Sequence, residues 1–135
     1  MQADASRTYA LLSSNAENHV GVFGAVDVKA ILKLTASEEE AAKRDALVAI
    51  GNISVMIKNQ LMVAKLGGLV AVSLALDSSF ESCQRFACRC MYRLSAHQEL
   101  QRQCLDSGAV PPLSKLCYSN SALVRKFAAM SLTNI

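Results

Sequence analysis

The sequence predicts an all-α fold in which similar helical units stack into a solenoid. Three observations lead to this prediction: a repeat period of about 41 residues, an apolar composition dominated by Ala, Leu and Val, and helix-start signals before two long segments. Hydrophobic residues make up 52% of the 135 residues, aromatic residues only 5%, and Trp is absent. Small aliphatic side chains suit closely packed helices, whereas sheets favour aromatic and β-branched residues.

Three segments of the chain share one pattern, and each begins with a basic residue: Arg44, Arg85 and Lys126, which are equally spaced by one period. Alanine and two larger apolar residues follow at the same offsets in each segment. Positions i, i+4 and i+7 lie on one face of a helix, so each segment is predicted to form a long helix that buries this stripe. The stripe positions are Ala46, Ile50 and Ile53; Ala87, Met91 and Leu94; and Ala128, Leu132 and Ile135.

Glycines mark the shorter helices of each unit. Gly24, Gly67 and Gly108 each precede a short apolar run, which predicts a bend before a second helix. The first interval is two residues longer than the second, and we expect the extra residues in the polar stretch 35–43, because a surface loop accommodates an insertion at least cost. The prolines at 111–112 fit the first turn of a helix, where a missing N–H costs little.

Two serine–glutamate pairs predict where the first two long helices begin. Ser37 is followed by Glu40, and Ser78 by Glu81, which matches the S-x-x-E capping box. Each unit is therefore expected to consist of a short helix, a glycine bend, a medium helix, a polar turn and a long helix. Such a unit cannot bury its apolar face alone, so the units must stack.

This pattern resembles the armadillo repeat. The period, the short–medium–long helix order, the phrase "SGAVPPLSKL" at 107–116 and the ending "AIGNIS" at 49–54 all match that family. The resemblance implies a right-handed α-solenoid, or superhelix, of three-helix repeats. Tetratricopeptide and ankyrin arrays have periods of about 34 and 33 residues, which do not fit. HEAT repeats are the nearest rival, but a glycine bend between two short helices argues against them.

The chain is expected to form a single armadillo-repeat domain that is part of a longer array. Neither end reads as a polar capping helix, so the apolar end faces should be covered, either by further repeats or by end-to-end stacking and self-association. We divide the chain into the end of a preceding helix at 1–14 and repeats at 15–54, 55–95 and 96–135.

The resemblance also implies a groove, lined by the long helices, that binds extended peptides. An asparagine near the end of each long helix grips the peptide backbone in armadillo proteins, because an amide offers both a donor and an acceptor. That role falls on Asn52 and Asn134, while Arg93 stands there in the second repeat. Counted from the next glycine, Tyr9 holds the same place in the preceding helix.

Importin-type arrays also carry a Trp four residues before that asparagine. Val48, Arg89 and Met130 occupy these positions here, so a nuclear-import receptor is a poor interpretation. Met130 and Val48 could instead offer apolar contacts to a bound segment.

In the second long helix, arginine stands at both the tryptophan position and the asparagine position of the family pattern. Arg85, Arg89 and Arg93 are spaced four apart, so they form one stripe, which we expect on the exposed side of the helix. Stacking would add Arg44 and Lys126, and the resemblance then implies a β-catenin-like basic groove for an extended acidic or phosphorylated protein segment. The predicted partner-binding residues are Arg44, Asn52, Arg85, Arg89, Arg93, Lys126, Met130 and Asn134.

Other interpretations of the same residues stay open. Basic residues on an exposed helix face are ordinary solubilising groups, and the module would then serve only as a structural building block that stacks within a larger assembly. A nucleic-acid-binding solenoid would use the same arginines, but the net charge is only +3 and Tyr92 is the one aromatic residue expected near the strip. Nucleic acid is therefore an unlikely partner.

The cysteines indicate packing rather than chemistry. Their number is odd and their spacing fits neither a disulfide framework nor a zinc site, so we expect free thiols buried between helices. The five are Cys83, Cys88, Cys90, Cys104 and Cys117.

The sequence predicts no enzyme. It lacks nucleophile-elbow, phosphate-loop, zinc-protease and paired-carboxylate motifs, and His19 and His97 read as surface or capping residues. We therefore expect no cofactor, no metal and no small-molecule substrate. The longest apolar run is about half of the roughly 20 residues that span a bilayer, so membrane insertion is not expected. The start lacks the features of a signal peptide, which favours a cytoplasmic protein, with nuclear or cytoskeleton- and cilium-associated locations as variants.

Overall fold

The computed structural model describes residues 2–14 and 24–135, and within these residues the secondary structure is helical, with no strand. The helices follow one another in the order that the sequence predicts. They are α1 (Gln2–Ser14), α2 (Ala25–Leu34), α3 (Glu40–Ile53), α4 (Ile57–Lys65), α5 (Gly68–Ala75), α6 (Glu81–Ser95), the short 3-10 helix η2 (Gln98–Leu100), α7 (Gln101–Asp106), α8 (Val110–Leu116) and α9 (Ala122–Asn134).

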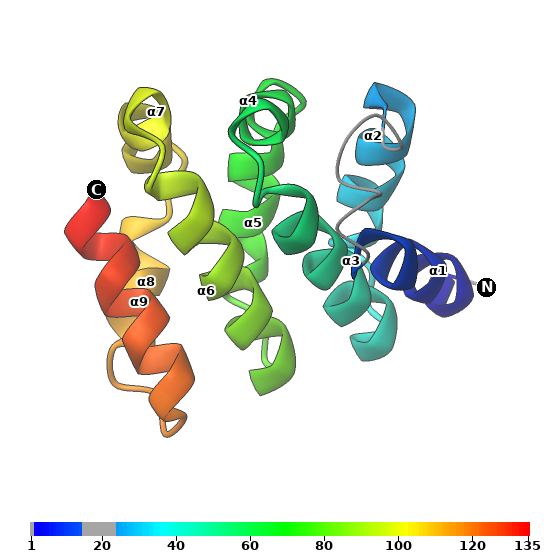
Figure 1. The fold of residues 1–135 in the computed structure, drawn as a ribbon. Coiled ribbons are helices and arrows are strands. Elements are labelled where there is room, and N and C mark those ends of the chain that lie inside the picture. Colours follow the sequence, from blue (N-terminus) through cyan, green and yellow to red (C-terminus); the bar gives the residue numbers. More distant parts are fainter. Residues whose placement is uncertain (1, 15–23) are drawn as a thin grey trace.

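The helices group into stacked units. Helices α4, α5 and α6 form one unit, and η2 with α7, α8 and α9 forms the next. Helices α2 and α3 hold the corresponding places in the first unit, whose expected first helix lies outside the described residues. The long helices α3, α6 and α9 lie side by side, and α5 and α8 lie behind them (Figure 1). The result is an all-α solenoid.

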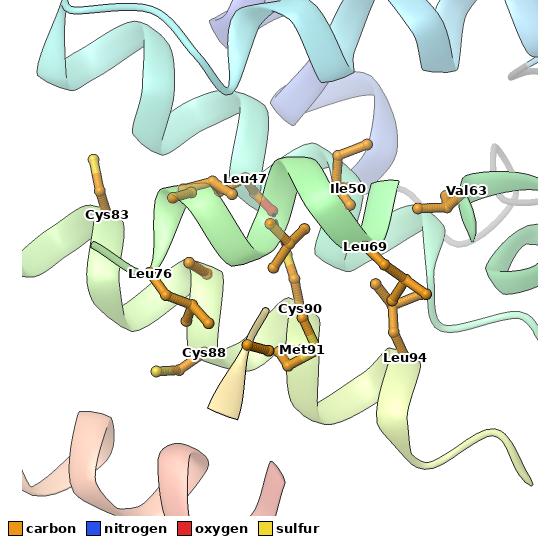
Figure 2. Packing of buried hydrophobic residues seen from close by; sticks show 14 of the residues in the cluster. Leu47, Ile50, Val63, Leu69, Leu76, Cys83, Cys88, Cys90, Met91 and Leu94 are labelled. Carbon is orange, nitrogen blue, oxygen red and sulfur yellow. Dashed lines mark hydrogen bonds between the residues drawn. The ribbon is translucent and has the colours of Figure 1, made fainter. Parts of the chain in front are cut away.

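The core lies between the long helices and the shorter helices of each unit. Figure 2 shows apolar side chains of α3, α5 and α6 gathered in one cluster, with Leu47, Met91 and Leu94 among the fully buried ones. The predicted apolar stripes are confirmed on α3 and α6, where all six residues have no exposed surface. On α9, Leu132 and Ile135 are only half-buried, because α9 is the last described helix and no later one packs on it.

The serines before the long helices act differently from the expected capping boxes. Ser37 and Ser78 accept a hydrogen bond at Oγ from the N–H two residues later, on Glu39 and Phe80, at 3.2 Å in both cases. The helices then begin at Glu40 and Glu81, so the helix starts are confirmed and the capping boxes are wrong. The serine closes the turn that precedes the helix instead.

The two extra residues of the first unit lie in a helix, not in the loop. Ser37 and Ser78 are one repeat period apart and close equivalent turns, so any insertion must precede Ser37. Helix α2 has 10 residues against 8 in α5, which accommodates it. The glycine before α2 also differs from its counterparts in the next two units. Gly24 has an ordinary φ of −87°, whereas Gly67 and Gly108 adopt left-handed φ values of 91° and 86°.

Helix α1 runs alongside α3 in the same direction. Its first residues reach the start of α3, where Ser37 Oγ donates to Gln2 Oε1 at 2.5 Å. Its last turn reaches the end of α3, where Asn52 Nδ2 donates to Ser13 Oγ at 3.3 Å. Ser13 lies one repeat period before Ser54, so the α1 residue that corresponds to Asn52 is Leu11 and not Tyr9.

Four of the cysteines are fully buried packing groups, as predicted, and Cys117 is half-buried. Cys90 Sγ donates to the Leu47 carbonyl oxygen of the neighbouring unit at 3.1 Å. Burial raises the pKa of the Cys90 thiol to about 12, so the group stays protonated and unreactive. Among the described helices, none has the length and apolar character needed to cross a bilayer.

Candidate functional site

The predicted site residues fall on one regular array that we call the long-helix face. It consists of three equivalent positions on each of α3, α6 and α9, spaced four apart along a helix and one repeat period apart between helices. All except Lys126 are half-buried. The nine residues are Arg44, Val48 and Asn52 on α3, Arg85, Arg89 and Arg93 on α6, and Lys126, Met130 and Asn134 on α9.

The arginines of α6, which we expected on the exposed side of the helix, are half-buried, because two of them lean onto α3. Arg93 Nη1 donates a hydrogen bond to the Gly51 carbonyl oxygen. Arg89 Nη2 donates to Asn52 Oδ1 at 3.4 Å. The guanidinium groups therefore bridge two neighbouring units. They cover part of the line along which α3 and α6 pack together, and we call such a line between two adjacent long helices a seam.

Gly51 makes this arrangement sterically feasible. A Cβ atom at this position would lie 3.0 Å from Arg89 Nη2 and 3.3 Å from its Nε. Real Cβ atoms rarely come so close to a neighbour, so the Arg89 guanidinium occupies the notch that the missing side chain leaves. The sequence contains no direct sign of this contact, because Gly51 and Arg89 belong to different units.

Phe86 holds the other side of the arginine cluster and is a site residue that the sequence reasoning missed. The Cζ atoms of Arg85 and Arg89 lie 4.8 and 5.1 Å from its ring centroid. Both distances are within the range of a cation–π contact. The i, i+3 spacing of Phe86 and Arg89 on a helix was the available signal.

The positive charge of this cluster is poorly compensated. Within residues 2–14 and 24–135, Arg44 pairs with its neighbour Asp45 at 3.3 Å, but no carboxylate lies at ion-pair distance from the three arginines of α6. Burial lowers the pKa of the Arg89 guanidinium, and repulsion from Arg93 and Arg85 adds to this effect, while the Cys90 thiol opposes it. The Nε atom of Arg89 is buried and has no hydrogen-bond acceptor among the described residues.

The two asparagines serve the seams between long helices. Asn52 Nδ2 donates to Ser13 Oγ on α1, and its Oδ1 accepts from Arg89, so both of its amide atoms are engaged. Asn134 repeats the first contact, because its Nδ2 donates to Ser95 Oγ on α6 at 3.2 Å. The same residue type at the same position thus makes the same hydrogen bond, here called a clasp, between α3 and α1 and between α9 and α6.

Arg93 breaks this pattern at the middle seam. An asparagine there would face Ser54, which lies 39 residues earlier, as Ser13 does from Asn52. Arg93 bonds the Gly51 carbonyl instead, and Ser54 Oγ is left buried without a hydrogen-bond partner among the described residues. The substitution therefore removes one clasp and adds one cation to the face.

Aromatic and aliphatic groups border the cations. Tyr92 of α6 and Phe127 of α9 pack with ring centroids 5.8 Å apart, and Val48 and Met130 are half-buried beside the arginine positions. The long-helix face thus combines cations with short apolar stretches.

Two further groups have structural roles. His97, read from the sequence as a surface or capping residue, is confirmed as a cap: its Nδ1 accepts from the N–H of Glu99 at 3.2 Å, at the start of η2. His19 lies outside the described residues. No group of three or more His, Cys, Asp or Glu side chains that could hold a metal ion occurs in the described part of the chain.

Solved structures with the same architecture identify the fold. Computationally designed armadillo repeat proteins for modular peptide recognition superpose with a TM-score of 0.91 and 24% sequence identity over 98% of this chain and 57% of theirs. A designed armadillo repeat protein in complex with the peptide (KR)4 gives a TM-score of 0.87 and 23% identity over 98% of this chain and 56% of that one.

A third superposition concerns a structure whose subject is the interaction between cadherin and β-catenin. A structure describing the phosphorylation switch between cadherin and β-catenin superposes with a TM-score of 0.88 and 22% identity, over 98% of this chain and 25% of that one. The chain thus spans a little over half the length of the designed proteins and a quarter of this one. No protein-family model matches the sequence, and no curated protein matches it significantly.

The repeating helices, the seams between them and the three superpositions agree with one another. The chain has the fold of the armadillo repeat proteins.

Proposed function

We propose that this chain is a protein-interaction module that binds an extended acidic segment of another protein along the long-helix face. The observation that carries the proposal is the cluster of Arg85, Arg89 and Arg93, which has no carboxylate partner among the described residues. Three cations held together on one helix repel one another, and an anionic ligand relieves that repulsion.

The superposed structures support the protein-interaction role in this proposal. A designed protein of the same fold was solved in complex with the peptide (KR)4, and another was designed for modular peptide recognition. The arginines on this chain reverse the sign of charge that a peptide must carry. An acidic or phosphorylated segment is therefore the ligand class that fits, because arginine binds carboxylates and phosphates through paired hydrogen bonds.

The magnitude shows what else the ligand must provide. Exposed ion pairs contribute about 0.2–1 kcal/mol each, so four cations supply on the order of 1–4 kcal/mol. The four are the cations of the long-helix face that have no ion-pair partner among the described residues: Arg85, Arg89, Arg93 and Lys126. A micromolar complex needs about 8 kcal/mol. Backbone hydrogen bonds and contacts with Val48, Tyr92 and Met130 must supply the remainder.

The asparagines contribute less than the resemblance implies. Asn52 uses one amide N–H on Ser13 and one lone pair of its Oδ1 on Arg89, so only one donor and one acceptor position remain for a ligand. Asn134 has its Oδ1 available, because only its Nδ2 takes part in the clasp to Ser95.

Fluorescence anisotropy with short labelled peptides tests the proposal. Eight extended residues reach about 26 Å, which crosses three helices packed about 10 Å apart, so (DE)4 and (KR)4 are suitable acidic and basic probes. We compare the wild-type protein with Arg85→Glu/Arg89→Glu/Arg93→Glu. The matched control is Lys58→Glu/Lys65→Glu/Lys115→Glu, which changes the net charge equally at exposed lysines outside the long helices.

The expected result is that the wild-type protein and the lysine control bind (DE)4 more tightly than (KR)4, and that the arginine variant loses this preference while keeping its helical circular dichroism. Equal loss in both variants would reduce the effect to net charge. Absence of any preference in the wild-type protein would favour the building-block interpretation. Equally tight, steeply salt-dependent binding of a single-stranded oligonucleotide would favour the nucleic-acid interpretation.

A further inference from the structure

Helix α5 is apolar on nearly its whole circumference. Its inner side packs into the core through Leu69, Val72 and Ala75, yet its outer side also carries Val70 and Leu74, which are 54% and 70% exposed. These two residues are four apart, so they lie on the same side of the helix. A helix that is hydrophobic all round is normally buried, so the exposed side of α5 lacks a covering element among the described residues.

A hollow of about 430 Å³ adjoins this exposed side, between α2 and α5. Its lining is aliphatic apart from Thr35 and Lys43, and the Thr35 Oγ1 already donates to the Leu32 carbonyl oxygen at 2.6 Å. None of the nine residues of the long-helix face takes part. The lining residues are Leu32, Thr35, Ala36, Lys43, Gly67, Val70, Ala71, Leu74 and Ala75.

The α2 side of this hollow is basic. A second hollow on α2, of about 330 Å³, is lined by Val26, Lys29, Ala30 and Lys33. Lys29 and Lys33 are four residues apart and therefore lie on one side of α2, between the two hollows. Together with Lys43, the charged residues of both linings are lysines, and neither lining contains Asp or Glu.

We propose that the outer side of α2 and α5, here called the short-helix face, is a docking site for an acidic amphipathic α-helix of a partner protein. The trough between two helices, with Val70 and Leu74 as ridges, matches the way an amphipathic helix lays its apolar side into a groove. The lysine rim complements Asp or Glu residues that flank the apolar side of the incoming helix.

The chemistry of the hollow distinguishes a helix from an extended peptide. An extended segment would bring unpaired backbone N–H and C=O groups onto a mainly apolar surface, on which the Thr35 hydroxyl is already engaged with the Leu32 carbonyl oxygen. A helix satisfies its own backbone groups internally and presents side chains only. This site therefore takes a different ligand conformation from the long-helix face, and it does not depend on the function proposed for that face.

A displayed library of amphipathic helices of about 18 residues tests the proposal, since this length makes five turns. The apolar positions vary among aliphatic and aromatic residues, and the flanking positions among Glu, Gln and Lys. Selected sequences are then synthesised, and their affinities are measured against Leu74→Asp and against Lys29→Glu/Lys33→Glu. Leu105→Asp, on α7, is the matched control, because Leu105 is also an exposed leucine, at 46%.

The expected result is enrichment of Glu at the flanking positions and at least about tenfold weaker binding to both short-helix-face variants, with affinity unchanged in the control and in the arginine variant of the long-helix face. Failure to enrich any binder, or enrichment of Lys over Glu, would overturn the proposal. So would binders that tolerate Leu74→Asp or that compete with (DE)4.

Discussion

Replacing Gly51 by alanine places a methyl group 3.0 Å from Nη2 of Arg89, so the guanidinium must leave the notch on α3. The nearest obstacle is the end of a flexible side chain, so the rest of the structure can stay in place. The arginine then loses its hydrogen bond to Asn52 and moves relative to Phe86. In return, the helix gains a residue with better helical propensity.

The opposing terms are of similar size. Alanine is favoured over glycine in a helix by about 0.8–1.0 kcal/mol. Losing the cation–π contact costs about 0.5–1 kcal/mol and losing the hydrogen bond about 0.5–1.5 kcal/mol. The free energy of unfolding should therefore fall by between zero and about 1.7 kcal/mol, well below the cost of a large core truncation.

A double-mutant cycle isolates the contact. In an Arg89→Ala background nothing occupies the notch, so Gly51→Ala should stabilise the protein by about 0.8–1.0 kcal/mol, the full difference in helical propensity. The coupling energy between the two sites is then about 1–2.5 kcal/mol, which urea denaturation of the four proteins measures. If Gly51→Ala changes the stability equally in both backgrounds, Arg89 does not rest on Gly51 and the description of the seam is incorrect.

Three further predictions concern hydrogen bonds, backbone and pH. Ser54→Ala should leave the stability unchanged or higher, because the buried Ser54 hydroxyl has no partner among the described residues. Ser95→Ala should cost about 0.5–1.5 kcal/mol, because it removes the acceptor of the Asn134 amide. Urea denaturation compares the two variants, and equal losses of stability would contradict the role given to the Asn134–Ser95 hydrogen bond. Gly67→Ala should destabilise the protein by about 1–2 kcal/mol, because the φ of Gly67 is 91°. Gly24→Ala should not, because Gly24 has a φ of −87° and open space around a Cβ atom. A thermal melt in which both variants behave alike would refute this difference. The pKa of the Cys90 thiol is raised from 9.0 to about 12 in the folded chain, so the unfolded chain loses this proton at lower pH. The stability should therefore fall as the pH rises from 9 toward 12. Cys90→Ala should flatten that decline, and an unchanged slope in the variant would contradict the prediction.

The repeat period predicted the order of the helices because equivalent positions recur at a fixed spacing. Ala46, Ile50 and Ile53 needed only helical periodicity to be assigned to the core, and the structure buries all three. The two-residue insertion was misplaced because the spacing of Gly24 and Gly67 gives only the length of the interval, not the element that holds the extra residues. The same spacing was also misleading about the first glycine. Gly24 resembles Gly67 in the sequence, but only the backbone angle shows that it makes no left-handed bend.

The candidate site was less predictable, because it depends on contacts between units. Helical spacing places Arg89 on the side opposite the core, but its exposure is decided by the absence of a side chain at Gly51 on the next long helix. The role of Asn52 likewise depends on Ser13, 39 residues earlier, and on Arg89, 37 residues later. Periodicity within one helix cannot reveal such partners.

The double engagement of Asn52 links ligand affinity to the shape of the array. Its hydrogen bonds with Ser13 and Arg89 hold the amide in one orientation, and each of them helps to fix how one long helix lies against the next. A ligand that bonds the remaining amide positions in that orientation binds more tightly when the long helices are held more tightly, and by thermodynamic reciprocity it strengthens those helix contacts in turn. The pitch of the superhelix and the occupancy of the proposed binding face are then coupled, so a mechanical load that bends the array would also change the affinity for such a ligand.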